Sequence, residues 1–212
     1  MKALIFDLDG VILSTDELHY QAWSVIARQE GIAFDRSVND RLRGISRMDS
    51  LDIILSYSSR EYSLLEKQRL AEQKNNAYRK LLEDLEPRAV FEGVVDTLRA
   101  LRRHGYKIAI ASSSKNACFI LEKVGLTQYF DAISDGNGLV HAKPDGEVYS
   151  RAASMLGIPA SLCGAIDDAM AGIQSAKNAG MTAFAIGPSC KSPLADYRLE
   201  RITDLLGILE IE

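Results

Sequence analysis

The first fifteen residues place the tightest constraint on how this chain can fold. The apolar run from Ala3 to Phe6 is too short to form a helical face before Asp7, so it predicts a strand buried on both faces of a parallel sheet. Asp7 and Asp9 follow the end of this strand, and Gly10 permits a sharp turn. Ligands bind at the carboxyl ends of strands in open α/β sheets. Because two carboxylates this close repel each other, the pair favours a divalent cation such as Mg²⁺; the alternative is that both acids only cap a helix or line a polar turn.

The rest of the chain predicts an α/β core interrupted by a helical insertion. Helical patterns without any strand signal fill the interval up to Pro87. Strand patterns then alternate with helices, over residues 107–111, 130–134, 162–166 and 182–186. We therefore predict a doubly wound parallel α/β sheet formed by residues 1–14 and 90–212. A small all-helical cap domain, residues 15–89, is inserted after the first strand.

Composition and charge restrict the class of partner and the compartment. A net charge of −4 over 212 residues offers no basic excess for neutralising nucleic-acid phosphates. The widely spaced Cys118, Cys163 and Cys190 fit reduced thiols rather than disulfides or a metal site. No signal-peptide pattern or apolar run of membrane-spanning length occurs, and no apolar surface stripe suggests a partner chain. We expect a cytoplasmic monomer that binds neither nucleic acid nor membranes.

Polar side chains also follow the later predicted strands. Ser112 ends the second strand, where it either offers a hydroxyl to a phosphate or only caps the next helix. Lys143 precedes a proline on a loop, a position at which lysines usually face solvent. Asp167 and Asp168 end the fourth strand, where adjacent acids favour a shared cation or cap the following helix. Together with the N-terminal acids, these groups form the set that phosphoryl transfer requires.

The string FDLDGV resembles the nucleophile motif of the haloacid dehalogenase-like phosphotransferases. The strand-end groups also match the order of that family's four motifs: Asp7 with Asp9, then Ser112, then Lys143, then Asp167 with Asp168. The resemblance implies that Asp7 is a nucleophile that becomes an aspartyl phosphate and that Asp9 is the general acid/base. It also implies a Mg²⁺ cofactor, with Asp7, Asp9, Asp167 and Asp168 as the expected metal ligands.

Further strings in both predicted domains resemble the β-phosphoglucomutase family: HxxAW from His19, LRGISRxxSL from Leu42, ASSSKNA from Ala111 and DDAMAGIQSAK from Asp167. The resemblance implies interconversion of β-glucose 1-phosphate and glucose 6-phosphate through β-glucose 1,6-bisphosphate. Thr15 and His19 would couple the acid/base to closure of the cap, and Arg47 would bind the second phosphate of the substrate. The remaining expected substrate-binding residues are Trp23, Arg43, Gly44, Ile45, Ser46, Ser50, Lys74, Ser114, Lys115 and Asn116.

Other interpretations remain at this stage. Arg47 alone also fits a surface arginine at the start of a helix, and His19 a helix-face residue packed beside Trp23. The string Asp167-Asp168-Ala169 stands where the resemblance predicts Glu-Asp-Ser, so the first acid is one methylene shorter than expected. A phosphatase acting on small sugar phosphates is the first alternative function, and a catalytically silent binding module is the second. The hexose, its pathway and the balance between mutase and phosphatase activity are left open.

Overall fold

The computed structural model describes residues 1–211 and divides into two compact units. The first combines Met1–Ser14 with Glu86–Glu212, and the second is Thr15–Leu85. The return to the first unit therefore lies at Glu86 and not at residue 90. Residues 86–89 form a turn bonded to the next residues, since the Ala89 amide donates to Glu86 and the Val90 amide to Pro87, and Val90 in turn bridges Leu13. Glu212, the last residue of the predicted core, lies outside the described residues.

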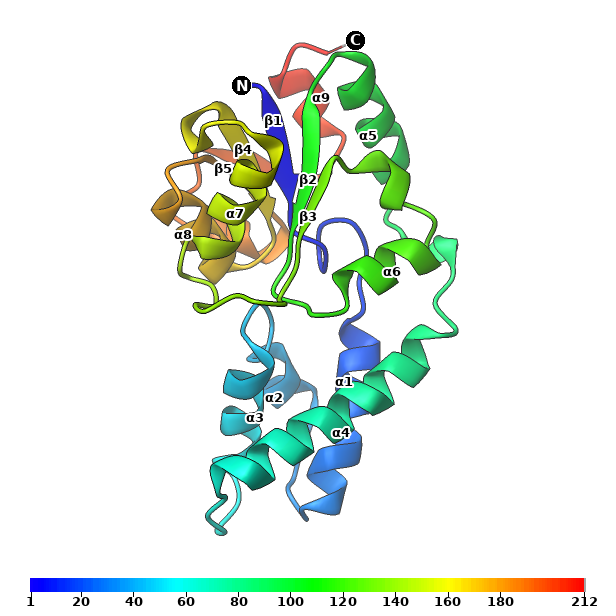
Figure 1. Ribbon diagram of the computed structural model, residues 1–212, viewed down its shortest axis with the longest axis vertical. Coiled ribbons are helices and arrows are strands. Elements are labelled where there is room, and N and C mark those ends of the chain that lie inside the picture. The colour runs from blue at the N-terminus through cyan, green and yellow to red at the C-terminus, as the bar shows by residue number, and fades with distance from the viewer. Residues whose placement is uncertain (212) are drawn as a thin grey trace. The chain divides into compact units, whose positions relative to one another are not determined.

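The first unit is built on one six-stranded sheet in which every strand pair is parallel. The strand order is β3-β2-β1-β4-β5-β6, with the N-terminal strand at the centre (Figure 1). The strands are β1 Ala3–Phe6, β2 Lys107–Ala111, β3 Ala132–Ser134, β4 Cys163–Asp167, β5 Thr182–Ile186 and β6 Tyr197–Leu199. The predicted doubly wound α/β class is confirmed.

The register of the central strands aligns their carboxyl ends. Phe6 of β1 lies opposite Ile110 of β2 on one side and Ile166 of β4 on the other. All four residues of β1 are buried, as expected of a strand covered on both faces. The residues that follow β1 and β2, and the last residue of β4, are therefore delivered to the same edge of the sheet.

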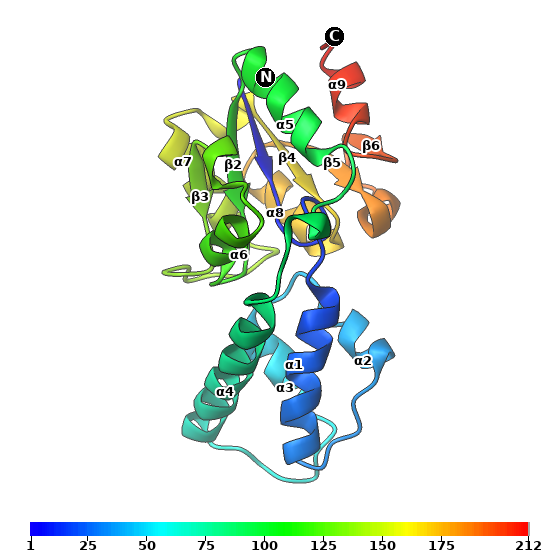
Figure 2. The same cartoon turned by 90° about the vertical axis from the view of Figure 1, so that its right-hand side faces the viewer.

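Helices cover both faces of this sheet. Figures 1 and 2 show α7 and α8 on one face and α5 and α6 on the other. The helices of this unit are α5 Val94–Arg103, α6 Ala117–Lys123, α7 Glu147–Leu156, α8 Met170–Asn178 and α9 Asp204–Ile208. Short 3₁₀ turns complete it, at η1 Pro87–Ala89, η2 Thr127–Tyr129, η3 Ala160–Leu162 and η4 Gly187–Lys191. Small strand residues, including Ala109 and Ala165, let α7 pack Tyr149 directly on the sheet.

The second unit contains only helices among its regular elements. They are α1 Asp16–Gln29, α2 Arg36–Asp40, α3 Arg47–Leu55 and α4 Leu64–Leu82. The two long helices, α1 and α4, pack along each other around a core that includes Trp23, Ile26 and Leu51. A capping box starts α4, where Ser63 and Glu66 satisfy each other's backbone amides. Side-chain packing and capping thus define a helical insertion of the predicted kind.

Some element bounds differ from those predicted. The third strand starts at Ala132 instead of residue 130, because Phe130 is the C-cap residue of the turn η2. The fourth strand extends to Asp167, so this acid is the last strand residue rather than the first residue beyond it. The edge strand β6 and the helix α9 were not predicted from the sequence pattern.

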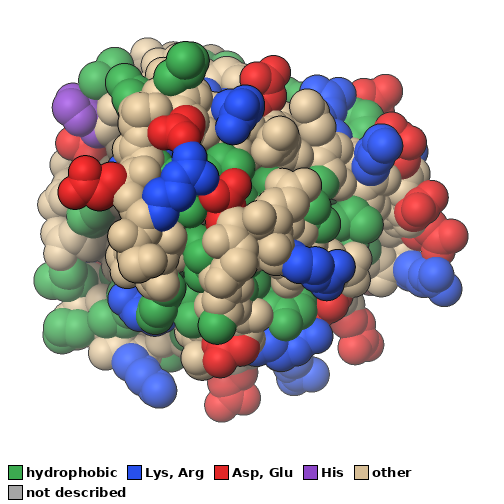
Figure 3. Space-filling view, turned by 90° about the horizontal axis from the view of Figure 1, so that it is seen from below, with side chains coloured by type: hydrophobic (Ala, Val, Ile, Leu, Met, Phe, Trp, Pro, Cys, Tyr) green, Lys and Arg blue, Asp and Glu red, His purple; other side chains and the backbone are tan. Residues whose placement is uncertain are grey.

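The surface carries charges of both signs. Figure 3 shows lysine and arginine side chains interspersed with acidic ones on the face seen from below. Over residues 1–211, no helix is both long enough and apolar enough to cross a membrane.

Candidate active site

Three strands place polar groups at one edge of the sheet. Asp7 follows β1 directly, Ser112 follows β2, and Asp167 is the last residue of β4. All three are buried, with exposed fractions of 8%, 3% and 1%. The structure therefore brings together the strand-end groups that the sequence pattern placed at this edge.

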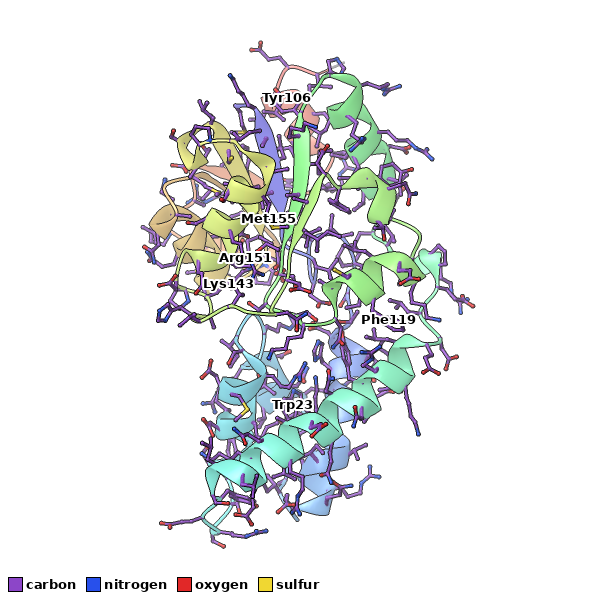
Figure 4. The ribbon with its side chains drawn as sticks, in the orientation of Figure 1. Trp23, Tyr106, Phe119, Lys143, Arg151 and Met155 are labelled. Carbon is purple, nitrogen blue, oxygen red and sulfur yellow. The ribbon has the colours of Figure 1, made fainter. Side chains whose placement is uncertain are left out.

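Lys143 supplies the positive charge among these acids. It lies on the loop between β3 and α7, and its ammonium donates to Asp7 Oδ1 and to Asp167 Oδ2, each at 2.7 Å. The side chain is buried, so the expectation for an isolated loop lysine, that it faces solvent, does not apply. The neighbouring Arg151 of α7 ties down the loop, donating to Ser134 Oγ at 2.9 Å and to the Asn137 carbonyl at 2.7 Å. Figure 4 labels Lys143 and Arg151 where this loop meets α7.

The electrostatics of the group leave it short of positive charge. Burial raises the pKa of Asp7 well above its ordinary value; the Lys143 ammonium opposes this rise, while the Asp167 and Asp168 charges add to it. Burial alone would lower the pKa of Lys143, but the carboxylates of Asp167 and Asp7 outweigh it and raise that pKa. Lys143 is therefore protonated at neutral pH, and the three carboxylates still repel one another.

The acids fit a divalent cation. Oxygen atoms of Asp7, Asp167 and Asp168 lie within 4.8 Å of one another, and an all-oxygen donor set suits Mg²⁺. A Cβ on Gly10 would fall 2.2 Å from Asp168 Cγ, so the absence of a side chain there lets the carboxylate approach the turn after β1. Asp9, the fourth expected ligand, is not in this group of carboxylates.

A tight turn follows β2 at the same edge of the sheet as Asp7. Ser112 Oγ accepts the Ser114 amide at 3.1 Å, and Ser114 Oγ accepts the Asn116 amide at 3.2 Å. Asn116, not Ser112, is the N-cap residue of α6, so the capping alternative for Ser112 is wrong. Because the Ser112 oxygen accepts in this turn, its hydroxyl hydrogen remains a donor for an anion. Lys115 lies exposed in the same turn.

In the helical unit, four predicted residues and one unpredicted residue form a buried polar cluster between α1 and α4. The Thr15 hydroxyl bonds the Tyr78 hydroxyl at 2.7 Å, and Lys74 Nζ bonds His19 Nδ1 at 2.6 Å. The Lys74 ammonium also lies 4.8 Å from the Trp23 ring and 4.5 Å from the Tyr78 ring, as expected for cation–π contacts. Figure 4 labels Trp23 in this unit. The His19 ring is stacked on Tyr78 and bonded to Lys74.

Charge in this cluster is positive. Burial lowers the pKa of His19 well below its ordinary value, and the charges of Lys74 and Arg47 lower it further. A lysine donates to Nδ1, so the neutral imidazole carries its proton on Nε2. Arg47 is half-buried at the first position of α3, and burial lowers its pKa. Ser50, one turn further along α3, is buried.

The remaining predicted residues, in the loop before α3, have local roles in this structure. Arg43 pairs with Asp16 at 2.6 Å and with Asp40 at 3.2 Å. Gly44 has a φ of +75°, and Ser46 is the N-cap of α3, accepting the Asp49 amide at 3.2 Å. Ile45 is half-buried between them. These contacts fix the conformation of the loop and the start of α3, and with it the position of Arg47.

Two tyrosines in the site were missed by reasoning from the sequence. Tyr78 lies four residues after Lys74, so one face of α4 carries both, and this spacing was the available signal. Tyr149 of α7 is fully buried and donates to Asp167 Oδ2 at 2.6 Å. In the sequence, Tyr149 only continues an apolar stripe, so nothing distinguishes it from a core residue.

Comparisons with known proteins agree with the motifs. The family model for the haloacid dehalogenase-like hydrolases matches residues 1–180. The β-phosphoglucomutase of Bacillus subtilis is 43% identical over 207 residues, covering 97% of this chain and 92% of that protein. The fructose-1-phosphate phosphatase of Escherichia coli is 31% identical over 182 residues, covering 85% of this chain and 93% of that protein.

A solved structure supports the same grouping. The crystal structure of β-phosphoglucomutase from Clostridium difficile superposes with a TM-score of 0.93 at 36% identity, covering 99% of this chain and 96% of that one. A structure of CbbY from Rhodobacter sphaeroides in complex with xylulose-1,5-bisphosphate shares the fold, with a TM-score of 0.81 at 21% identity. It covers 97% of this chain and 96% of that one.

Proposed function

The chain belongs to the haloacid dehalogenase-like hydrolase family, as its motifs predicted, and from this premise we propose that it is a phosphosugar mutase of β-phosphoglucomutase type. The observation that carries the proposal is the buried Lys143 ammonium between Asp7 and Asp167 at the carboxyl edge of the sheet. This arrangement supports Asp7 as a nucleophile toward phosphorus. The proposed reaction interconverts β-glucose 1-phosphate and glucose 6-phosphate.

The reaction consists of two transfers through Asp7. The phosphorylated Asp7 first gives its phosphoryl group to the 6-hydroxyl of β-glucose 1-phosphate, while Asp9 removes the proton of that hydroxyl. The resulting β-glucose 1,6-bisphosphate then reverses its orientation, so that the phosphate on C1 faces Asp7. Asp7 attacks the phosphorus on C1, the bond to the C1 oxygen breaks, and Asp9 returns its proton to that oxygen. Glucose 6-phosphate leaves, and the aspartyl phosphate is restored.

The other groups at the edge act on charge and position. Lys143 lies at hydrogen-bond distance from Asp7, so it favours the ionised carboxylate and neutralises the oxygens of the transferring group. Ser112 and the turn through Ser114 offer hydroxyl and backbone donors to the same oxygens. Asp7, Asp167 and Asp168 would hold Mg²⁺, which when bound offsets the repulsion among these carboxylates and the charge of the phosphoryl oxygens.

The helical unit supplies what a mutase needs beyond a phosphatase. The positive charges of Lys74 and Arg47 both act on His19, so together they favour an anion near α1 and α3. We assign Arg47 to the second phosphate of the sugar, because a guanidinium binds phosphate with two parallel hydrogen bonds. Thr15 and His19 couple Asp9 to cap closure, and closure around a phosphosugar excludes water from the aspartyl phosphate. Trp23, Ser50 and Lys74 would contact the sugar.

A phosphatase acting on small sugar phosphates is the second candidate. The observation that favours it is the identity to the fructose-1-phosphate phosphatase over most of both chains. The two candidates share Asp7 and Asp9 and differ in the acceptor, which is water in one case and a sugar hydroxyl in the other. The higher identity to a β-phosphoglucomutase places the mutase first. We further propose that the protein acts in the cytoplasm as a monomer. It should not bind nucleic acid, because its net charge of −4 offers no basic excess for phosphates.

One assay separates these candidates. The protein is incubated with Mg²⁺, β-glucose 1-phosphate and a trace of the 1,6-bisphosphate, and glucose 6-phosphate and inorganic phosphate are followed separately. A mutase forms mainly glucose 6-phosphate, and Asp7→Asn abolishes its formation. Release of mainly inorganic phosphate would support the phosphatase, and the absence of both products would contradict each enzymatic reading for this sugar.

The role of Arg47 is tested by a second comparison. Arg47→Ala should lower kcat/KM for the mutase reaction about 10- to 100-fold, the effect of one charged hydrogen-bonding group. Hydrolysis of a small aryl phosphate, which has no second phosphate, should change little. Arg41→Ala is the matched control, because this exposed arginine of the same unit donates to the Tyr57 hydroxyl at 2.6 Å. Equal losses of Arg47→Ala on both substrates would refute the assignment.

A further inference from the structure

Asp167 is unusually well supplied with hydrogen bonds for an acid in a metal site. Its Oδ2 accepts from Lys143 at 2.7 Å and from the Tyr149 hydroxyl at 2.6 Å. Its Oδ1 accepts the Ala169 amide at 2.9 Å. A carboxylate offers about four acceptor positions, so roughly one, on Oδ1, is left for a cation. Three donors from the loop, α7 and the start of α8 thus fix the plane of this carboxylate.

The carboxylate is also held close to the backbone. A Cβ on Gly172 of α8 would fall 1.9 Å from Asp167 Cγ, so the carboxyl group occupies the space that a side chain would take there. The β-phosphoglucomutase motif predicts a glutamate at this position, and aspartate is one methylene shorter. The shorter side chain keeps its carboxylate near the end of β4, where the Tyr149 hydroxyl reaches it from α7. The hydroxyl and the shortened acid therefore fit each other.

Tyr149 also affects Lys143. The Lys143 ammonium lies 5.0 Å from the centre of the Tyr149 ring, and both residues bond the same Asp167 oxygen. An ammonium on a flexible stem has no orientation of its own, so its position depends on the acceptors around it. With Oδ2 fixed by a second donor, the ammonium is held against Asp7 Oδ1 at 2.7 Å.

We propose that Tyr149 is a positioning residue, which acts through Asp167 to hold Lys143 against the nucleophile Asp7 and makes up for the shortened acid at position 167. The inference rests on the proposed function for its catalytic consequence. Tyr149 itself touches neither the sugar nor the transferred group in this proposal. Loss of its hydroxyl frees Oδ2 and lets the ammonium move away from Asp7, which slows the phosphoryl transfers without weakening sugar binding.

A double-mutant cycle tests the link. Tyr149→Phe, Asp167→Glu and the double variant are compared with the parent protein. Tyr149→Phe should lower kcat about tenfold, the effect of one hydrogen bond to a charged group, and should leave KM within about twofold. On the Asp167→Glu background the longer side chain places the carboxylate away from its position beside the Tyr149 hydroxyl. Tyr149→Phe should therefore alter kcat on this background by less than about threefold. Tyr129→Phe is the control, because it removes a hydroxyl that accepts from exposed Arg99 at 3.2 Å.

A second readout does not depend on the reaction. Melting temperatures of the four proteins are measured in EDTA, where Tyr149→Phe should lower the value on the parent background and change it less on the Asp167→Glu background. Asp167→Asn replaces Asp167→Glu if the latter does not fold, and the neutral amide should likewise remove the coupling. Equal effects of Tyr149→Phe on both backgrounds, in kcat and in melting temperature, would overturn the proposal. If the parent protein shows no mutase turnover, the proposed function fails. The coupling between Tyr149 and Asp167 is then still decided by the melting temperatures and by the rate of hydrolysis of a small acyl phosphate.

Discussion

Replacing Lys143 by methionine should destabilise the metal-free protein strongly and make its stability depend on Mg²⁺. The ammonium is buried and bonds Asp7 and Asp167, each at 2.7 Å. Methionine keeps the apolar volume and removes the charge. Three acids whose oxygens lie within 4.8 Å of one another then have no neighbouring ammonium. Their mutual repulsion should appear as a loss of free energy of unfolding.

The size of the loss follows from the burial of the pair. Removing one partner of a buried ion pair costs about 3–5 kcal/mol, because the other charge is left without compensation. Burial already raises the pKa of Asp7, so this acid can take up a proton in the variant, which places the loss near the lower end, at about 3 kcal/mol. For a chain of this length, about 3 kcal/mol corresponds to a fall of roughly 6–12 °C in Tm.

Calorimetry in EDTA and in Mg²⁺ measures both parts of this prediction. Lys177→Met is the matched control, because Lys177 bonds Asp196 at 2.9 Å and both side chains are about a third exposed, at 34% and 38%. An exposed pair contributes at most about 1 kcal/mol, so the control should lose no more than about 4 °C. Mg²⁺ should raise the Tm of Lys143→Met by more than that of the parent, since the cation replaces the missing charge. Equal losses in the two variants, or equal stabilisation of variant and parent by Mg²⁺, would refute the reasoning.

Two further predictions concern packing and pH. Gly172→Ala should destabilise the protein by about 1–3 kcal/mol in chemical denaturation, because the new Cβ would lie 1.9 Å from Asp167 Cγ. Gly207→Ala is the control: its Cβ would have no atom within 4 Å, so this change should be neutral or stabilising by up to about 1 kcal/mol. The folded-state pKa of His19 is lowered, so only the unfolded chain takes up this proton as the pH drops below about 6.5. The free energy of unfolding should therefore decrease on acidification, by up to about 1.4 kcal/mol per pH unit. His19→Asn should lack this component between about pH 5.5 and pH 7.5, and an unchanged slope would contradict the neutral, half-buried imidazole.

A strand can be predicted from the sequence when it is buried enough to show a continuous apolar run. The strands Ala3–Phe6 and Lys107–Ala111 have the bounds that their apolar runs predict, because both lie in the centre of the sheet. The edge strand Tyr197–Leu199 has two exposed residues out of three, so it lacks the apolar signature of a central strand. Its assignment depends on pairing with β5, which no local pattern encodes.

The site shows the same division. Asp7, Ser112 and Asp167 could be placed together because parallel strands end at one edge, and that rule needs only the strand pattern. The position of Lys143 could not be derived in this way, since a loop residue 136 positions from Asp7 reaches it only through the path of the loop. Tyr149 is further out of reach of pattern reasoning: its ring satisfies the apolar stripe of α7, and only its hydroxyl, bonded to Asp167, distinguishes it from a core residue.

Two acids and one lysine act on Asp7, whereas a lysine and an arginine act on His19, and this difference in charged neighbours is the reason for assigning the two units different parts of one substrate in the proposed reaction. Around Asp7, burial raises the carboxylate pKa and the Asp167 and Asp168 charges add to the rise against the effect of Lys143, so added positive charge favours phosphoryl transfer to Asp7. Around His19, burial lowers the imidazole pKa and the charges of Lys74 and Arg47 lower it further, so the two basic side chains beside this ring favour an anion without a metal. A sugar bearing one phosphate meets only one of these two requirements at a time. In the proposed mutase cycle, a hexose bisphosphate meets both, because either of its phosphates can react at Asp7 while the other is bound by Arg47. A plain phosphatase has no corresponding use for the second positive site.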